Sequence, residues 1–173
     1  LVQTPNSICD ASLTNPAASF NGSVAATINN QVGAINNYVF TWRNGQLTTD
    51  PVNATSNNQN LNNLNSGYYT TTVLHTPTGC VSPAVNIQVL DNTVLPALAT
   101  NAVPSTNCDP LLANGQALVT SVDGAGTGSP YIFQWHNGNT ITSAIAGATS
   151  ATLSNRNGGA GALFTVLVTN QTN

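Results

Sequence analysis

Few side chains in this sequence could carry out catalysis. The chain has five Asp and two His residues but no Glu and no Lys. A Ser/His/Asp hydrolase would need His75 or His136 as its general base. His136, however, directly follows Trp135, and Arg43 holds the same place after Trp42 in a second copy of this segment. A position that accepts both His and Arg is typical of a solvated side chain at a strand end, so we predict no catalytic residues and no enzymatic activity.

The acidic residues and cysteines do not form a metal-binding pattern either. Calcium loops use several closely spaced Asp residues, and no Asp-x-Asp-x-Asp run occurs. Zinc sites need closely spaced Cys or His pairs, which are also missing from the sequence. Glycoside hydrolysis requires two carboxylates at a controlled distance, which five scattered Asp residues do not suggest. The sequence predicts no cofactor and leaves open only a weak calcium site at Asp10 or Asp109.

Charged residues are rare in this chain. They make up 4% of the residues, and the net charge is −3 at pH 7. With two Arg and no Lys, the chain cannot line a groove that follows a phosphate backbone, so we expect no nucleic acid partner. No run of 18 apolar residues is present, so we expect no membrane insertion. A neutral surface of Asn, Thr, Ser and Gln, with few sites for trypsin-like proteases, suits a long-lived extracellular protein.

The elements that would position these residues form a tandem repeat. The sequence YVFTWRNG at residues 38–45 returns 93 positions later (131 − 38) as YIFQWHNG at residues 131–138. Aromatic residues alternate with others in each copy, which places three rings on one buried face of a strand. This repeat core consists of Tyr38, Phe40, Trp42, Tyr131, Phe133 and Trp135. We predict two domains, residues 1–93 and 94–173, joined near residues 91–104.

Each repeat has the pattern of short β-strands separated by Gly, Asn or Pro. An Asn-Gly pair follows each aromatic strand, at residues 44–45 and 137–138, and predicts a turn there. Further strands are expected at residues 23–28, 68–74, 84–90, 116–121 and 163–169. No segment has the periodicity of an amphipathic helix. The sequence predicts an all-β chain of two tandem immunoglobulin-like β-sandwich domains, the second of which lacks its last strand.

The three cysteines suggest an oxidising compartment. Cys9 precedes the first strong strand and Cys80 follows the strand at 68–74, so in a sandwich the two could meet at one end and form a disulfide. Buried, reduced thiols are the alternative. Cys108 is the counterpart of Cys9, and no counterpart of Cys80 follows it. We therefore expect Cys108 to be unpaired within this chain, or to bond to a cysteine outside it.

Carbohydrate could be involved in two ways. Sequons for N-glycosylation begin at Asn21, Asn53 and Asn170, although about as many arise by chance in a chain this rich in Asn, Ser and Thr. Binding of surface glycans would need an exposed aromatic ring. Tyr68 is the first candidate, because it stands beside Tyr69 and neighbouring strand residues point to opposite faces. A carbohydrate-binding accessory module of a secreted protein is therefore an alternative function.

The order of these motifs resembles that of a known family. It comprises a Cys, a Gly-bearing first strand, Tyr-x-Phe-x-Trp-x-Asn-Gly, LNSGYYT at residues 64–70 and Gly-Cys at residues 79–80. This order is similar to the immunoglobulin-like or PKD-like repeats of large cell-surface adhesins in the Bacteroidota, including gliding-motility adhesins. The resemblance implies an extracellular, cell-surface protein with many repeats. We expect a structural or adhesive segment of a stalk or filament, whose partners are neighbouring repeats or copies of itself.

A filament subunit that exchanges strands with its neighbours is a further alternative. In such a protein, a segment from a neighbour would complete the second domain by adding a strand to its sheet. The sequence feature behind this alternative is the missing last strand of the second repeat. It predicts an unpaired sheet edge along residues 163–169.

Overall fold

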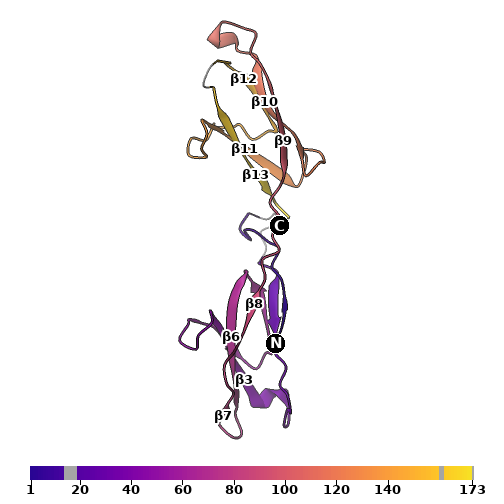
Figure 1. Cartoon of the computed structure of the whole chain (residues 1–173), viewed down its shortest axis with the longest axis vertical. Coiled ribbons are helices and arrows are strands. Elements are labelled where there is room, and N and C mark those ends of the chain that lie inside the picture. Colours follow the sequence, from indigo (N-terminus) through magenta and orange to yellow (C-terminus); the bar gives the residue numbers. More distant parts are fainter. Residues whose placement is uncertain (14–18, 160–161, 173) are drawn as a thin grey trace. The chain divides into compact units, whose positions relative to one another are not determined.

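The computed structural model describes residues 1–13, 19–159 and 162–172 of the chain (Figure 1). Besides β-strands it contains two single-turn 3-10 helices, η1 (Ile35–Asn37) and η2 (Pro110–Leu112). The chain divides into two compact units, unit 1 and unit 2, built mainly from residues 1–94 and 95–172. No helix long and apolar enough to cross a membrane occurs in these described ranges.

Unit 1 is a sandwich of two antiparallel sheets. The first has the order β1-β2-β5 and consists of β1 (Val2–Thr4), β2 (Gly22–Ala25) and β5 (Asn60–Leu64). The second has the order β4-β3-β6, with β7 and β8 on the far side of β6. Its members are β4 (Val52–Ser56), β3 (Tyr38–Asn44), β6 (Gly67–His75), β7 (Cys80–Val81) and β8 (Val85–Val89). This strand order is that of an immunoglobulin-like sandwich.

β7 and β8 are two parts of one interrupted strand. Both pair with the same edge of β6. The interruption falls at Ser82 and Pro83, because proline has no amide hydrogen to donate to a ladder. Ser82 compensates: its amide donates to the Val73 carbonyl at 2.8 Å, and its hydroxyl accepts from the Val73 amide at 3.0 Å. The strand thereby continues along β6 as far as Val89.

The core of unit 1 is centred on β3. Its alternate side chains Tyr38, Phe40 and Trp42 are buried, as the period-two pattern predicts. They pack with Val24 of β2 and Val89 of β8. Burying a large apolar side chain stabilises a fold by roughly 1.5–3 kcal/mol, so these three rings make β3 the main stabilising strand.

A tyrosine corner closes the end of unit 1 where the chain crosses from β5 to β6. The Tyr69 hydroxyl donates a hydrogen bond of 3.0 Å to the backbone oxygen of Asn65, four residues upstream. A tyrosine in this position, bonded to the backbone just before it, is a recurrent feature of immunoglobulin-like domains.

Unit 2 has the same architecture with fewer strands (Figure 1). One sheet has the order β12-β10-β9 and consists of β9 (Leu98–Val103), β10 (Gly115–Val122) and β12 (Thr152–Arg156). The other pairs β11 (Tyr131–Asn137) with β13 (Phe164–Asn170). The part of unit 2 that the structure describes contains no counterpart of β7 and β8. The prediction of two immunoglobulin-like sandwiches is confirmed, and the described part of the second contains no last strand.

Both units carry the same β-bulge. Asn63 in β5 and Asn155 in β12 have positive φ angles of 61° and 58°, a backbone conformation that Asn tolerates better than most residues. The pairing register shifts beside each of them, at Gly22 of β2 and Gly115 of β10. Gly22 and Gly115 therefore occupy equivalent positions in the two units.

The predicted join at residues 91–104 is too long, because its second half forms β9 (Leu98–Val103), although the two units do divide within it, between Val94 and Leu95. All side chains of β9 are exposed, so no buried face marks this strand in the sequence. The connection between the last strand of unit 1 and the first strand of unit 2 is therefore confined to residues 90–97.

The other predicted strands are present as β2, β6, β8, β10 and β13, with ends displaced by one to three residues. The aromatic strands end at Asn44 and Asn137 as predicted, and the glycines that follow them, Gly45 and Gly138, have φ angles of 128° and 84°. In unit 1 the chain then reaches β4 through residues 45–51, which is longer than a two-residue hairpin loop.

Candidate functional site

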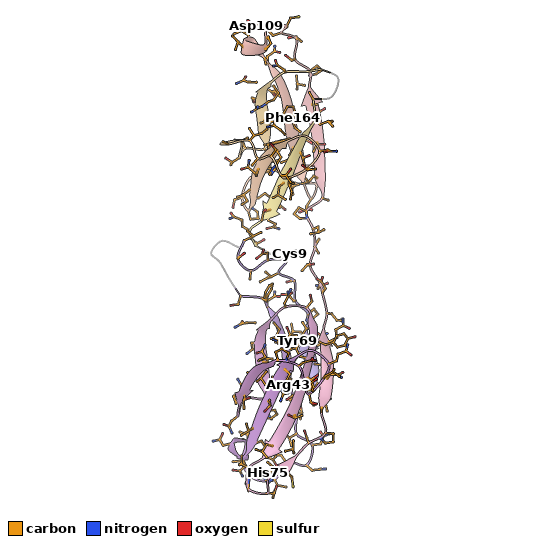
Figure 2. The ribbon with its side chains drawn as sticks, turned by 90° about the vertical axis from the view of Figure 1, so that its left-hand side faces the viewer. Cys9, Arg43, Tyr69, His75, Asp109 and Phe164 are labelled. Carbon is orange, nitrogen blue, oxygen red and sulfur yellow. The ribbon has the colours of Figure 1, made fainter. Side chains whose placement is uncertain are left out.

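The predicted disulfide between Cys9 and Cys80 is wrong. Cys9, Cys80 and Cys108 all lie in the described part of the chain, and all three are free, exposed thiols. Cys80 follows the hairpin at the His75 end of β6, whereas Cys9 lies at the opposite end of unit 1 (Figure 2). The nine residues of β6 span roughly 26 Å at about 3.3 Å per residue. A disulfide requires Cα atoms within about 7 Å, so this pair cannot bond without refolding.

His136 is not the solvated side chain that the sequence predicts. It is 5% exposed, and neither ring nitrogen has a hydrogen-bond partner among the described residues. The reason is the segment at residues 143–145, whose backbone bonds to β11 on both sides of His136, at 2.8 Å each. His75 is different, because its Nδ1 lies 2.8 Å from the Thr78 hydroxyl and its ring stacks on Tyr38 with centroids 4.7 Å apart.

The two Asp residues considered for calcium cap local turns. The hydroxyl and the amide of Ser12 both donate to Asp10 Oδ1, at 2.6 and 2.9 Å, and they lower the pKa of Asp10. Asp109 Oδ1 accepts a hydrogen bond of 2.9 Å from the Leu111 amide at the start of η2. Within the described ranges, no three His, Cys, Asp or Glu side chains gather closely enough to hold a metal ion.

The residues considered for carbohydrate differ in exposure and contacts. Tyr68 is 41% exposed, whereas its neighbour Tyr69 is 7% exposed, so Tyr68 is the ring that faces outward. Among the sequon residues, Asn53 donates through Nδ2 to Asn44 Oδ1 at 2.7 Å. Asn170 ends β13 and accepts hydrogen bonds from the residue two positions further on.

The third sequon residue, Asn21, belongs to a clamp that recurs in both units. Its side chain accepts a hydrogen bond from the Ser7 amide and donates one to the Ser7 hydroxyl, both at 2.8 Å. Asn114 makes the same two bonds with Thr106, both at 2.9 Å. Asn114 is not part of a sequon. The shared role of Asn21 and Asn114 is therefore to hold the loop before β2 or β10.

Unit 1 contains a fully buried polar residue, Asn6, at the end of the unit where the Asn21 clamp lies. Its side chain donates to the Ile8 carbonyl at 2.8 Å and accepts from the amides of Ile8 and Asn21 at 3.3 Å. Its backbone forms a parallel bridge: the Asn6 amide donates to Leu90 at 3.0 Å, and the Asn92 amide donates to Asn6 at 2.7 Å. The first and last segments of unit 1 thus run side by side in the same direction. A lone buried Asn has no periodic signature, so the sequence did not predict it.

The largest difference between the units lies along one edge of β13. Thr70 of β6 and Thr165 of β13 make the same corner bond, donating to the glycine after the aromatic strand at 2.7 and 2.8 Å. On its other edge β6 pairs with β7 and β8, whereas β13 has no partner there in the described part of unit 2. The edge expected from the sequence at residues 163–169 is therefore present, with a row of backbone groups that pair with none of the described strands.

A pocket of about 280 Å³ lies beside this edge. Its lining includes Gly115 and Ala117 of β10, Arg156 of β12 and Phe164 of β13. In unit 1 the corresponding space is filled, because a Cβ atom on Gly22 would lie 2.8 Å from a side-chain methyl of Val89. The pocket of unit 2 is therefore the space that the last strand occupies in unit 1.

Comparisons with known proteins give little further information. No protein-family model matches the chain, and no match was found among curated proteins. Among solved structures, the chain is similar to the three N-terminal domains of the highly immunogenic outer capsid protein (Hoc) of bacteriophage RB49, at 17% identity and a TM-score of 0.36. The match covers 97% of this chain and 55% of that one, so the chain spans about half its length. A likeness this distant says nothing about the function of this chain.

Proposed function

We propose that this chain is a load-bearing structural segment of an extracellular stalk or filament, without catalytic activity. The observation that carries the proposal is the parallel bridge between Asn6 and the segment after β8. Tension applied to the two ends of unit 1 would pull these segments in opposite directions along their length. The hydrogen bonds at Asn6 and those of β8 with β6 would then have to break together, which gives a high barrier to forced unfolding.

Other features support a surface location for such a segment. The repeat of one sandwich module within the chain is the arrangement by which long stalks are built. Because only 4% of the residues are charged, the electrostatic interactions of the chain change little with salt or pH. The resemblance of the motif order to cell-surface adhesin repeats of the Bacteroidota favours the same location, with neighbouring repeats or further copies of the chain as partners.

Single-molecule force spectroscopy of the whole chain, pulled from its two ends, tests this role. We expect a discrete unfolding event of unit 1 with a length gain of roughly 30 nm, from about 90 residues at about 3.5 Å each. Asn6→Ala should lower the force of this event, because the buried side chain holds the bridging backbone in place. The matched control is Ser105→Ala, since a Cβ atom on Gly115 would lie 3.2 Å from that of Ser105, as a Cβ atom on Gly22 would lie 3.3 Å from that of Asn6. A chain that extends without a force peak, or equal effects of the two variants, would contradict the proposal.

Glycan binding at Tyr68 is the second candidate function. The outward-facing ring of Tyr68 supports it, since aromatic rings stack on sugars and this ring is 41% exposed. Retention of the chain on an insoluble polysaccharide, lost on Tyr68→Ala and kept on Tyr69→Phe, would establish it. Passage of the unaltered chain through a panel of such polysaccharides without delay would remove it.

A further inference from the structure

We propose that Asn157 is a self-modifying residue, whose side-chain amide is slowly converted to a carboxylate through attack by the backbone nitrogen of Gly158. The reaction is an intramolecular deamidation, and its only co-reactant is water. It changes the net charge of the chain at pH 7 from −3 to −4, because a neutral amide becomes an acid. This inference goes beyond the load-bearing role and does not depend on it.

The chemistry joins two neighbouring residues. The Gly158 nitrogen loses its proton to a solvent base and attacks Cγ of Asn157. The bond between this nitrogen and Cγ forms, the bond between Cγ and Nδ2 breaks, and ammonia leaves, which gives a five-membered succinimide ring. Water then opens the ring at either carbonyl, so the products are an aspartate and an isoaspartate. Glycine favours the attack because it has no Cβ atom and its backbone rotates freely.

The sequence alone does not distinguish Asn157 from other asparagines that precede a glycine. Two of these asparagines stand in the same tripeptide, because Arg-Asn-Gly occurs at residues 43–45 and at residues 156–158. Asn44 is therefore a matched reference for Asn157, and the structure around each pair decides which one reacts. Asn-Gly pairs begin at five positions, Asn21, Asn44, Asn114, Asn137 and Asn157.

Hydrogen bonds hold the side chains of three of these asparagines. Asn21 and Asn114 form the clamps on the loops before β2 and β10, and the glycines that follow them are buried. Asn44 Oδ1 accepts a hydrogen bond of 2.7 Å from Asn53 Nδ2. Asn157 is exposed, and its side chain forms no hydrogen bond with any residue that the structure describes. It can therefore turn its Cγ atom toward the next backbone nitrogen without breaking a bond.

The glycine amide separates Asn157 from Asn137 as well. The Gly138 amide donates to the Leu163 carbonyl at 2.8 Å, and the Gly45 amide donates to a β6 carbonyl at the same distance. A nitrogen held in this way attacks only after its hydrogen bond opens. Gly158 is exposed, and its amide has no hydrogen-bond partner in the described ranges, so a solvent base can remove its proton.

The exposure of Asn157 does not depend on a last strand in its unit. Its counterpart in unit 1 is Asn65, which lies two residues after the left-handed Asn63 as Asn157 lies two residues after Asn155. Asn65 is exposed although unit 1 contains β7 and β8. The side chain of Asn65 is held by Asn6, whose Nδ2 donates to Asn65 Oδ1 at 3.3 Å.

The modification falls outside the folded core of unit 2. β12 ends at Arg156, so Asn157 lies just beyond the ladder between β12 and β10. Gly158 and Gly159, which follow it, are exposed. An isoaspartate lengthens the main chain by one atom, and this extra atom lies in the exposed segment. Unit 2 therefore stays folded, and the modified residue accumulates with time.

Peptide mapping of the aged whole chain tests the proposal. The chain is kept at neutral to mildly alkaline pH and is then digested with pepsin in acid, where succinimide formation is slow. Mass spectrometry gives the converted fraction of each asparagine. We expect Asn157 to convert at least roughly tenfold faster than Asn44, because Asn44 and Gly45 must each first break a hydrogen bond. Conversion should yield both products and should accelerate with pH, because hydroxide generates the attacking nitrogen.

Two controls separate the effect of structure from that of sequence. In urea, with both units unfolded, Asn44 and Asn157 should convert at similar rates, since their tripeptides are identical. The second control is Gly158→Ala. The added Cβ atom would lie 3.6 Å from its nearest neighbour, the Ser105 nitrogen, so the variant folds, yet its methyl group hinders the attack. Most conversion of Asn157 should be lost, whereas that of Asn137 should not change.

Four results would overturn the proposal. The first is equal conversion of Asn44 and Asn157 in the folded chain. The second is a difference between them that persists in urea, which would assign it to the sequence. The third is unchanged conversion in Gly158→Ala, which would mean that another group attacks. The fourth is unfolding of unit 2 as conversion proceeds, as Trp135 fluorescence would show.

Discussion

Unit 1 and unit 2 share their aromatic strand, their bulge and the hydrogen bond from a threonine to the glycine after the aromatic strand. Their cores nevertheless differ in how deeply the side chains are buried. Tyr69 is 7% exposed, whereas its more apolar counterpart Phe164 is only partly buried. Val89 has no counterpart in the described part of unit 2, and a pocket of about 280 Å³ takes its place. The burial of a core side chain in these sandwiches thus depends on the last strand of the sheet. A more apolar side chain, such as Phe164 in place of Tyr69, does not make up for the lack of that strand.

The two tryptophan side chains differ in the opposite sense, because the one with a hydrogen-bond partner lies in unit 2. Trp135 of unit 2 donates through Nε1 to the Ser150 carbonyl at 2.8 Å. Trp42 of unit 1 is more deeply buried, and its Nε1 has no hydrogen-bond partner among the described residues. A buried donor without a partner costs about 1–3 kcal/mol. Unit 1 therefore buries its core side chains more deeply but lacks this hydrogen bond. Unit 2 makes the hydrogen bond but buries its core less completely.

The largest expected effect is that of Phe40→Ala, which should destabilise unit 1 by about 4 kcal/mol because its ring is fully buried. The matched change Phe133→Ala should cost unit 2 at least about 1 kcal/mol less, since its sheet lacks the last strand. Urea unfolding followed by Trp42 fluorescence in a Trp135→Phe background reports unit 1, and the converse background reports unit 2. Equal costs would mean that the open edge does not affect the core.

The second prediction makes unit 1 resemble unit 2. Val89→Ala should destabilise unit 1 by about 2 kcal/mol, since it removes two buried methyl groups and opens the space beside Gly22. The control Val85→Ala lies on the same strand but is 51% exposed, and it should cost under about 0.5 kcal/mol. The same urea experiment measures both. Similar values for the two variants would show that β8 stabilises unit 1 by its backbone alone.

The third prediction removes the tyrosine corner. Tyr69→Phe gives unit 1 the side chain that unit 2 has at this position, and it deletes the hydrogen bond to Asn65. We expect a loss of about 1 kcal/mol, the usual net value of one such bond. Tyr68→Phe, on the exposed face, serves as the control and should change stability little. A loss as large for Tyr68→Phe would contradict a specific role for the corner.

The smallest effect concerns acid. The Ala97 amide and the Tyr131 hydroxyl both donate to the Asp123 carboxylate at 2.8 Å, and they lower its pKa. Tyr38, the counterpart of Tyr131, bonds instead to the neutral backbone of Val32. Tyr131→Phe should therefore raise the pKa of Asp123 part of the way to its ordinary value, whereas Tyr38→Phe should not, as NMR titration would show.

The sign of this acid effect follows from the lowered pKa. The Asp123 contribution to the stability of unit 2 is fully present above the ordinary pKa of an aspartate, and it is lost as the pH falls through the lower, folded-state value. An unchanged Asp123 titration in Tyr131→Phe would mean that the hydroxyl does not favour the ionised carboxylate.

Two kinds of pattern predict strands in this sequence. β3 and β11 alternate aromatic with other residues, and the aromatic face is the more buried one, although His136 is buried as well. β6 and β13 do not bury alternate residues, and they are predicted from their content of Thr, Tyr, Val and Leu. β9 is exposed along its whole length, so it has no apolar alternation and falls within the predicted join. β5 and β12 escape prediction for another reason, because a bulge at a left-handed Asn breaks the period of two. Local periodicity is visible only where one face of a regular strand is buried.

The candidate site depends more on topology than on local pattern. The unpaired edge of β13 follows from the comparison of two repeats, and the sequence alone predicts it. The predicted Cys9–Cys80 disulfide is wrong because the order of strands along the chain does not show which end of the sandwich each cysteine occupies. The two ends are separated by the nine residues of β6. His136 is buried by a segment seven or more residues further on, and no neighbouring residue signals that contact.

The bulge shared by β5 and β12 also bears on how each unit keeps its strands in register. A slip of one residue in a strand would turn every side chain to the opposite face of its sheet. The left-handed residues Asn63 and Asn155 fix the register at the same point in both units, although the residues after them, Leu64 and Arg156, differ in size and charge. The register at this point is therefore set by the backbone conformation of the Asn, whether the next side chain is apolar or charged.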